Sequence, residues 1–149
     1  MKSFFLSIII LFVIACAVNF PQDINFQQNL NSNNKLNAQS IVFNDIELGI
    51  ISNNVKKFSS YFSAQPYISL INGVNGYYSS NQAYYILEDF FNTFKVVSFK
   101  MNETKIADPV SSGKGDYYFE KKGKRELAHL YVTLSKSGDK WYITQISIN

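Results

Sequence analysis

The feature that most constrains the fold is a two-residue turn between two segments in which apolar and polar residues alternate. Lys122-Gly123 separates residues 115–120 from residues 124–136. Alternation with a period of two is typical of a β-strand with one buried face, and a two-residue turn that ends in glycine is typical of a β-hairpin. The turn therefore predicts a hairpin in which Lys121 lies opposite Lys124, and this register continues away from the turn along both strands.

This register makes one face of the hairpin apolar, and a last strand over residues 140–148 extends that face. We expect Tyr117, Phe119, Ala128, Leu130, Val132, Leu134, Trp141 and Ile143 to lie on it and to meet the helices. Ile146 and Ile148 are out of phase with Trp141 and Ile143. A β-bulge near Gln145 would return them to the apolar face.

The clearest helix of the chain precedes these strands. Ser79 and Gln82 have the spacing of a capping box, which predicts a helix over residues 80–94. Its apolar stripe, which must pack on the sheet, consists of Ala83, Ile86, Leu87, Phe90 and Phe94. Tyr84, Tyr85 and Phe91 lie at the flanks of the stripe, where core packing is the simpler role and the lining of a ligand pocket is the alternative.

Two shorter helices are expected upstream, over residues 45–52 and 55–62, because apolar residues recur there at helical spacing. Asn44 and Glu47 resemble a capping box at the start of the first. Asn53-Asn54 interrupts the run, since asparagine tolerates the left-handed conformation that ends helices.

The order of elements is therefore helix, helix, a small hairpin over residues 67–78, helix, and then strands only. Alternating strands and helices, which favour a parallel sheet, are not found. The sequence predicts an α+β domain over residues 41–149, with N-terminal helices packed on a strongly curved antiparallel sheet.

The first 17 residues have the pattern of a signal peptide. Lys2 is followed by an apolar run that is shorter than the about 20 residues needed to span a bilayer. Two processing outcomes compete. Ala15 and Ala17 suit a signal peptidase that cleaves after Ala17, whereas residues 13–16 resemble a bacterial lipobox, in which Cys16 becomes the lipidated first residue of the mature protein.

Residues 18–40 are rich in asparagine and glutamine, which make up half of residues 19–40. Such a segment buries too little apolar surface to offset its chain entropy. We expect a flexible tether between the signal segment and the folded domain.

Composition excludes several classes of site. One cysteine and one histidine exclude an internal disulfide, a multi-cysteine zinc site and a histidine-rich metal site, so we expect neither a metal nor a cofactor. The net charge of +3 is too mild to indicate a nucleic-acid partner.

Residues 78–91 carry a resemblance to a known family through a Tyr-Ser turn followed by Gln-Ala, Ile-Leu and Phe-Phe pairs. This segment resembles the core of domain-of-unknown-function family 4783, small exported proteins of Bacteroidetes-type bacteria. Residues 51–55 and 141–148 are also similar, so the resemblance covers nearly all of residues 41–149. It implies a nuclear-transport-factor-2-like fold of the cystatin-like superfamily, a cone made by a curved sheet wrapped around three helices. It implies no activity and no catalytic residues.

Folds of that superfamily often enclose a pocket in the cone, and their enzymes hold an acid or base against an apolar wall. Here the predicted apolar face offers only the phenol of Tyr117. Asp116 and His129 are opposite each other on the outer face and form the one acid–imidazole pair. They could orient a general base, but a solvated cross-strand pair is the simpler interpretation.

The outer face offers a better indication of an interaction. Tyr118, Leu127 and Tyr131 form an exposed aromatic and aliphatic patch that would suit a homodimer. Four basic residues at the hairpin tip, Lys121, Lys122, Lys124 and Arg125, either contact an anionic surface or simply solvate the turn.

Together these patterns predict an exported protein of the periplasm or of the outer-membrane-associated cell envelope. We expect a non-enzymatic ligand-binding or protein-interaction module, with a small apolar ligand in the cone or a second copy on the outer face as partner. Contact with the membrane would be made through a lipid on Cys16 alone. The alternative is a small pocket enzyme of the isomerase or hydro-lyase type.

Overall fold

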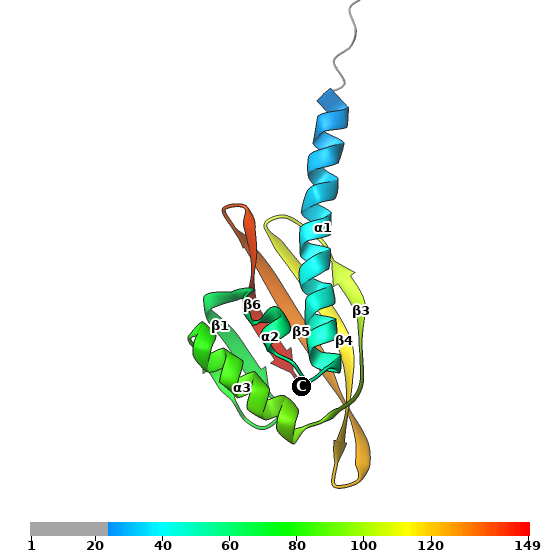
Figure 1. Ribbon diagram of the computed structural model, residues 1–149, viewed down its shortest axis with the longest axis vertical. Helices are drawn as coiled ribbons and strands as arrows, with labels where there is room; N and C mark the ends of the chain where they lie inside the picture. The colour runs from blue at the N-terminus through cyan, green and yellow to red at the C-terminus, as the bar shows by residue number, and fades with distance from the viewer. Residues whose placement is uncertain (1–23) are drawn as a thin grey trace, which may run out of the picture.

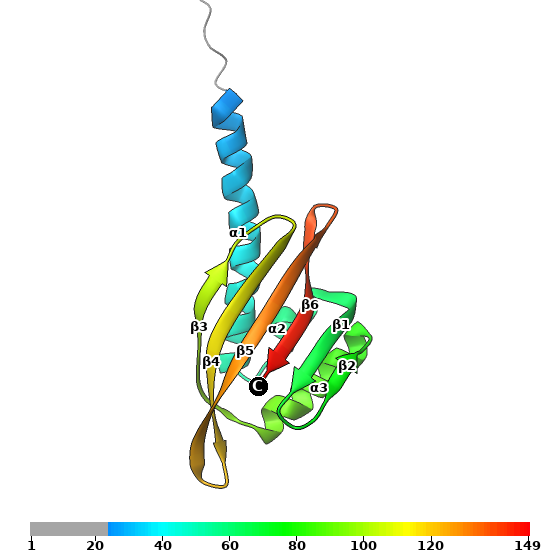
Figure 2. The same ribbon diagram turned by 180° about the vertical axis from the view of Figure 1, so that it is seen from behind.

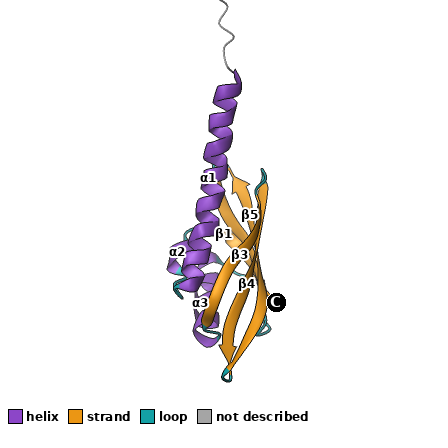
Figure 3. Ribbon diagram, turned by 90° about the vertical axis from the view of Figure 1, so that its right-hand side faces the viewer, coloured by secondary structure: helices purple, strands orange, loops and turns teal. Residues whose placement is uncertain are grey.

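The computed structural model describes residues 24–149, so the signal segment and Cys16 lie outside the described residues. One six-stranded sheet carries the helices on one face, as Figures 1 and 3 show. The elements in chain order are α1 (Ile24–Ile51), α2 (Lys56–Ser59), β1 (Phe62–Leu70), β2 (Asn75–Tyr77), α3 (Ser80–Thr93), β3 (Val96–Lys105), β4 (Val110–Lys121), β5 (Lys124–Ser137) and β6 (Lys140–Ile148). In this described part, no helix combines the length and the apolar character needed to cross a membrane.

The predicted α+β fold class is confirmed, with one correction to the sheet. The strand order is β2-β1-β6-β5-β4-β3, and β1 pairs with β6 in parallel, so the sheet is mixed and not purely antiparallel. The four other neighbouring pairs are antiparallel. The last strand returns along β5 and inserts beside β1, whose direction it then shares.

The predicted β4–β5 hairpin is confirmed along its whole length. Lys121 is the partner of Lys124, and the same register continues to Val110 and Ser135 at the far end. Lys122 and Gly123 have φ angles of 52° and 73°, which are the left-handed values that a tight hairpin turn requires at both positions. This long hairpin fixes which side chains share each face of the central sheet.

The predicted bulge in the last strand is also confirmed. Thr133 pairs with Gln145 while Leu134 pairs with Ile143, which leaves Thr144 as an extra residue on β6. As a result, Ile143, Ile146 and Ile148 all become buried. The shift also turns the side chain of Gln145 to the outer face, in line with its partner Thr133.

Helix α3 begins as the capping box predicts. The Ser79 hydroxyl accepts a hydrogen bond from the Gln82 backbone N–H, and the Gln82 side chain accepts one from the Ser79 backbone N–H at 3.0 Å. Within α3, Ala83, Leu87, Phe90 and Phe91 are buried against the sheet.

Helix α1 begins earlier in the chain than the sequence predicts. It runs without a break from Ile24, so residues 24–40 of the predicted tether are helical, and Asn44 lies inside the helix and does not cap it. The composition of this segment does not reveal that its C-terminal end packs on the rest of the domain. There Gln39 is 2% exposed and donates a hydrogen bond to the carbonyl oxygen of Ala107. The N-terminal part of α1 extends beyond the sheet in Figure 1.

The C-terminal end of α1 lies where the sequence predicts it, unlike its N-terminal end. Asn53 has a φ of 50°, which ends the helix where the Asn-Asn pair indicated. The second helix is shorter than expected, because Phe62 already begins β1 and is buried there.

Glu47 has a different role from the capping role predicted for it. Its carboxylate accepts a hydrogen bond from the Met101 backbone N–H at 2.9 Å and pairs with the Lys100 ammonium at 3.2 Å. β3 is an edge strand of the sheet, and an unpaired N–H on such an edge invites another strand. Glu47 therefore protects part of the open edge.

We expect Glu47→Ala to lower the free energy of unfolding by about 1–2 kcal/mol, because Met101 loses a charged acceptor. Urea denaturation followed by circular dichroism would measure this loss. Glu103→Ala is the matched control, since Glu103 is an exposed glutamate of β3 itself with no ion pair in the described residues. An equal loss in the two variants would contradict the protective role of Glu47.

Candidate functional site

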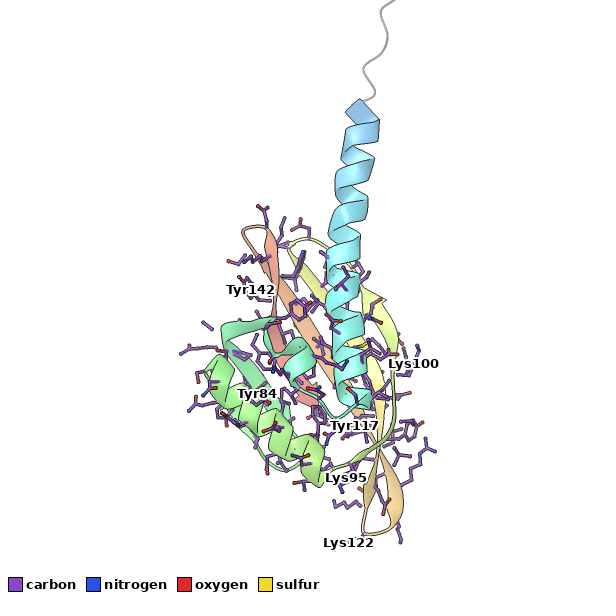
Figure 4. All side chains as sticks on the ribbon, in the orientation of Figure 1. Tyr84, Lys95, Lys100, Tyr117, Lys122 and Tyr142 are labelled. Atoms are coloured by element: carbon purple, nitrogen blue, oxygen red, sulfur yellow. The ribbon has the colours of Figure 1, made fainter. Side chains whose placement is uncertain are left out.

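The interior of the cone is filled by aromatic rings around Tyr117. Tyr117 is fully buried, and Figure 4 marks it between α1 and α3. Its ring centre lies 5.6 Å from that of Phe119 on the same strand, 5.8 Å from that of Phe91 and 6.1 Å from that of Phe90 on α3. Phe90, Phe91 and Phe119 are at most 2% exposed. Side chains therefore fill the interior of the predicted cone around Tyr117.

The phenol of Tyr117 has a hydrogen-bond partner inside this cluster. Its hydroxyl donates a hydrogen bond to the carbonyl oxygen of Phe94. Burial raises the pKa of Tyr117 well above its usual value, because the phenolate would lie in an apolar surrounding. The hydroxyl hydrogen is thus already engaged by a backbone carbonyl.

The three aromatic residues predicted at the flanks of α3 do not surround a common cavity. Phe91 packs in the core, whereas Tyr85 is 59% exposed. Tyr84 donates a hydrogen bond to Glu88 at 2.9 Å, and this bond raises the pKa of its phenol. Core packing accounts for Phe91, Tyr84 is half-buried against the core, and Tyr85 lies toward solvent.

The predicted acid–imidazole pair is present on the outer face of the sheet. His129 Nδ1 lies 2.9 Å from Asp116 Oδ1, and Asn102 donates to the other carboxylate oxygen of Asp116 at 2.7 Å. The side chains of His129 and Asp116 are 44% and 31% exposed. An open position on a sheet leaves the imidazole in water, which fits the interpretation as a polar cross-strand pair.

The predicted interaction patch also lies on the outer face, but its members differ. Leu127 and Tyr131 are 47% and 40% exposed. Tyr118 is half-buried, with the Arg125 guanidinium 4.3 Å from its ring centre. Arg125 also donates to the Ser98 hydroxyl at 2.9 Å. Tyr118 is thus covered by a cation, and Leu127 and Tyr131 remain open.

A groove of about 510 Å³ crosses this outer face. The side chains that line it are polar for the most part and include Lys105, Ser112, Lys114, Thr133, Gln145 and Asn149, with Tyr131 at one wall. Most of these residues were missed from the sequence. The signal was present in the hairpin register, which places Ser112, Lys114, Tyr131 and Thr133 on one face.

A second hollow of about 410 Å³ lies between α1 and the β5–β6 turn, beside Trp141 and Tyr61. Tyr61 donates to the Asp45 carboxylate at 2.7 Å, and this bond raises the pKa of Tyr61. Trp141 is only 6% exposed. The phenol of Tyr61 is thus already paired, and the Trp141 ring is largely covered.

Residues 24–149 contain no group of three or more histidine, cysteine, aspartate or glutamate side chains that could hold a metal.

Lys122, at the basic hairpin tip, lies at the opposite end of the molecule from the start of α1 in Figure 4.

The sequence profile of a family described as a domain of unknown function (DUF4783) matches residues 43–149. This agrees with the resemblance noted in residues 78–91. A search of the curated proteins finds no match.

Solved structures with this fold include a DUF4783 family protein from Bacteroides uniformis, with a TM-score of 0.64 and 18% identity over 71% of this chain and 94% of that one. A nuclear-transport-factor-2-like protein with a cystatin-like fold from Novosphingobium aromaticivorans has a TM-score of 0.62 and 5% identity over 87% and 90% of the two chains. A hypothetical protein with a ketosteroid isomerase-like fold from Catenulispora acidiphila, in complex with trimethylamine, has a TM-score of 0.57 and 13% identity over 72% and 83%. The predicted nuclear-transport-factor-2-like fold is confirmed, and these identities establish the fold alone.

Proposed function

The chain belongs to the DUF4783 family, and we propose that it is a non-enzymatic binding module of the cell envelope that contacts its partner with the outer face of the sheet. The single observation that carries this proposal is the contrast between the two faces of the sheet. The inside of the cone is closed around Tyr117, while the outer face has an open groove and exposed Leu127 and Tyr131.

The filled interior favours binding over catalysis. An enzyme of the isomerase or hydro-lyase type needs a desolvated carboxylate or imidazole at its pocket. His129, the one histidine, lies in the open on the outer face, and the buried phenol of Tyr117 donates to Phe94. No observation favours the enzyme, and a small apolar ligand in the cone has no support from the packing around Tyr117.

Export is part of the proposal and is supported by the sequence alone. Residues 1–17 have the pattern of a signal peptide, and Cys16 stands where a lipobox would place it. The domain then works in the periplasm or at the outer membrane. With a lipid on Cys16, α1 would separate the outer sheet face from the anchor.

A second copy of the chain is one partner that the outer face would fit, and the homodimer stays a prediction. Leu127 and Tyr131 are the exposed apolar residues on which it depends. Both lie on β5, near the centre of the sheet, where a symmetric contact between two sheets would form.

Photo-crosslinking in the cells that produce the protein tests the proposed surface. With Tyr131 replaced by the photoreactive analogue p-benzoylphenylalanine, we expect irradiation to join the full chain to another macromolecule. Tyr85 is the matched control, since it is an exposed tyrosine on α3, away from the sheet face. No adduct from position 131, or equal yields from the two positions, would overturn the proposal.

A further inference from the structure

The groove on the outer face is built from cross-strand rows of side chains. Figure 2 looks onto this face and shows β4, β5 and β6 side by side. One row runs from Lys105 through Ser112 and Thr133 to Gln145, each residue being the Cα partner of the next. Three steps between strands place the ends of this row about 14 Å apart. A ligand along it would cross four strands.

A second row runs beside the first. Glu103, Lys114, Tyr131 and Ser147 are successive Cα partners on the same four strands. The Lys114 ammonium lies 5.7 Å from the centre of the Tyr131 ring. This row therefore adds a cation and an aromatic wall to the polar floor of the first.

Several polar groups of the groove have no partner. In the described part of the chain, the side chains of Ser112, Thr133 and Gln145 form no hydrogen bond with protein groups. Gln145 is half-buried, and its amide has no protein partner within residues 24–149. A ligand with hydroxyl groups would supply donors and acceptors to these side chains in place of water.

The charges of the groove are also unpaired. Lys105 and Lys114 form no ion pair in the described residues, whereas Lys100 and Lys136 pair with Glu47 and Asp108. Glu103 is the one side-chain carboxylate at the groove, and it forms no ion pair with its neighbour Lys114. The main-chain carboxylate of Asn149 also lies there, and it accepts a hydrogen bond from the His129 backbone N–H at 2.7 Å. Lys105 and Lys114 are therefore cations without an acidic side-chain partner among the described residues, and an anionic ligand could supply one.

We propose that the groove binds an acidic oligosaccharide, a hydroxyl-rich chain with carboxylates on its sugars. The hydroxyls supply both donors and acceptors to Ser112, Thr133 and Gln145, and the carboxylates meet Lys105 and Lys114 as charge-assisted hydrogen bonds. This inference rests on the proposed function, because it names the ligand class of the same face.

The composition of the groove distinguishes this ligand from others. Pockets for small apolar ligands are lined by hydrophobic side chains, and here Tyr131 is the one exposed aromatic side chain at the wall. A peptide added as a strand would need a free strand edge, but β5 and β6 at the centre of the groove are paired on both sides.

Calorimetric titration of the full chain, purified in mild detergent, tests the proposal with two probes. Tetragalacturonic acid has a carboxylate on every sugar, and maltotetraose is a neutral chain of the same length. We expect the acid to bind with a Kd of about 1 mM or tighter at low ionic strength. We expect the neutral chain to bind at least about tenfold more weakly. Tighter binding of maltotetraose, or no binding of either probe, would overturn the proposal.

Three variants locate the binding. We expect Lys105→Gln with Lys114→Gln to weaken the affinity for tetragalacturonic acid at least about tenfold. Lys122→Gln with Lys124→Gln removes the same charge at the hairpin tip. An equal loss of affinity in this variant would show that the binding is non-specific charge attraction, and would overturn the proposal. We expect Gln145→Met to weaken binding about threefold or more at an unchanged Tm, because it removes only the unpartnered amide. Unchanged affinity in this variant would also contradict the proposed site.

The two experiments separate the two proposals. An adduct at position 131 together with failure of both saccharides leaves the outer face as the binding surface and rejects the ligand class. If position 131 gives no adduct and the saccharides do not bind, both proposals fail.

Discussion

Tyr117→Ala is expected to lower the free energy of unfolding by about 3–5 kcal/mol, which is the cost of removing a fully buried aromatic ring. Tyr117 is 0% exposed and contacts rings from α3, from β3 and from its own strand β4. A small domain has a total stability of about 5–15 kcal/mol, so this variant should be unfolded in part at 37 °C. Denaturation with guanidinium chloride, followed by far-ultraviolet circular dichroism, would measure the loss.

Tyr117→Phe is the control that separates the ring from the hydroxyl. It keeps the packing and removes the hydrogen bond to the Phe94 carbonyl, so we expect a loss of about 1–2 kcal/mol. A ligand pocket in the cone would give the opposite result for the alanine variant, because a site that is already hollow loses little on truncation. Losses below about 1.5 kcal/mol for Tyr117→Ala would therefore contradict the filled interior.

The parts of the fold that the sequence predicted well are those that local rules decide. The Lys122-Gly123 turn sets a register by its own geometry, and that register holds to the end of the hairpin. The capping box at Ser79 and the bulge before Ile146 likewise depend on residues a few positions apart. In each case the chemistry that decides the structure lies within one short segment.

The parts that were missed depend on contacts between distant segments. The parallel pairing of β1 with β6 joins Ile68 to Ile146, and no turn connects these strands directly. The helical conformation of residues 24–40 runs against their composition, since asparagine is a weak helix former. Glu47 satisfied a local capping pattern, but its carboxylate lies on the edge of β3.

For the same reason, only the part of the candidate site that lies on the hairpin could be predicted from the sequence. The hairpin register placed Asp116, His129, Leu127 and Tyr131 on one face correctly. The groove also needs β3 and β6, and both are joined to the hairpin with shifts in register. Lys105 and Gln145 could therefore not be aligned with Thr133 before the sheet was known.

Gly115→Ala is expected to destabilise the domain by about 2–3 kcal/mol, because the added methyl group has no space. A Cβ atom on Gly115 would lie 2.6 Å from the Lys100 carbonyl oxygen and 2.6 Å from the Phe99 ring. Lys100 belongs to the neighbouring strand, and its carbonyl is backbone, so relief requires β3 itself to move away from β4. The same denaturation experiment would measure the loss.

Gly113→Ala is the matched comparison, two residues earlier on the same strand and on the same buried face. Its Cβ atom would meet the Phe43 ring at 2.8 Å and the Met101 sulfur at 2.9 Å, and both contacts are with side chains. The methionine side chain adapts easily and the Phe43 ring belongs to α1, so relief does not require β3 to move away from β4. We expect Gly113→Ala to cost about 1 kcal/mol less than Gly115→Ala. Equal costs, or the reverse order, would mean that β3 is not held against β4 at Gly115. The edge strand that Glu47 protects would then be looser than its contacts indicate.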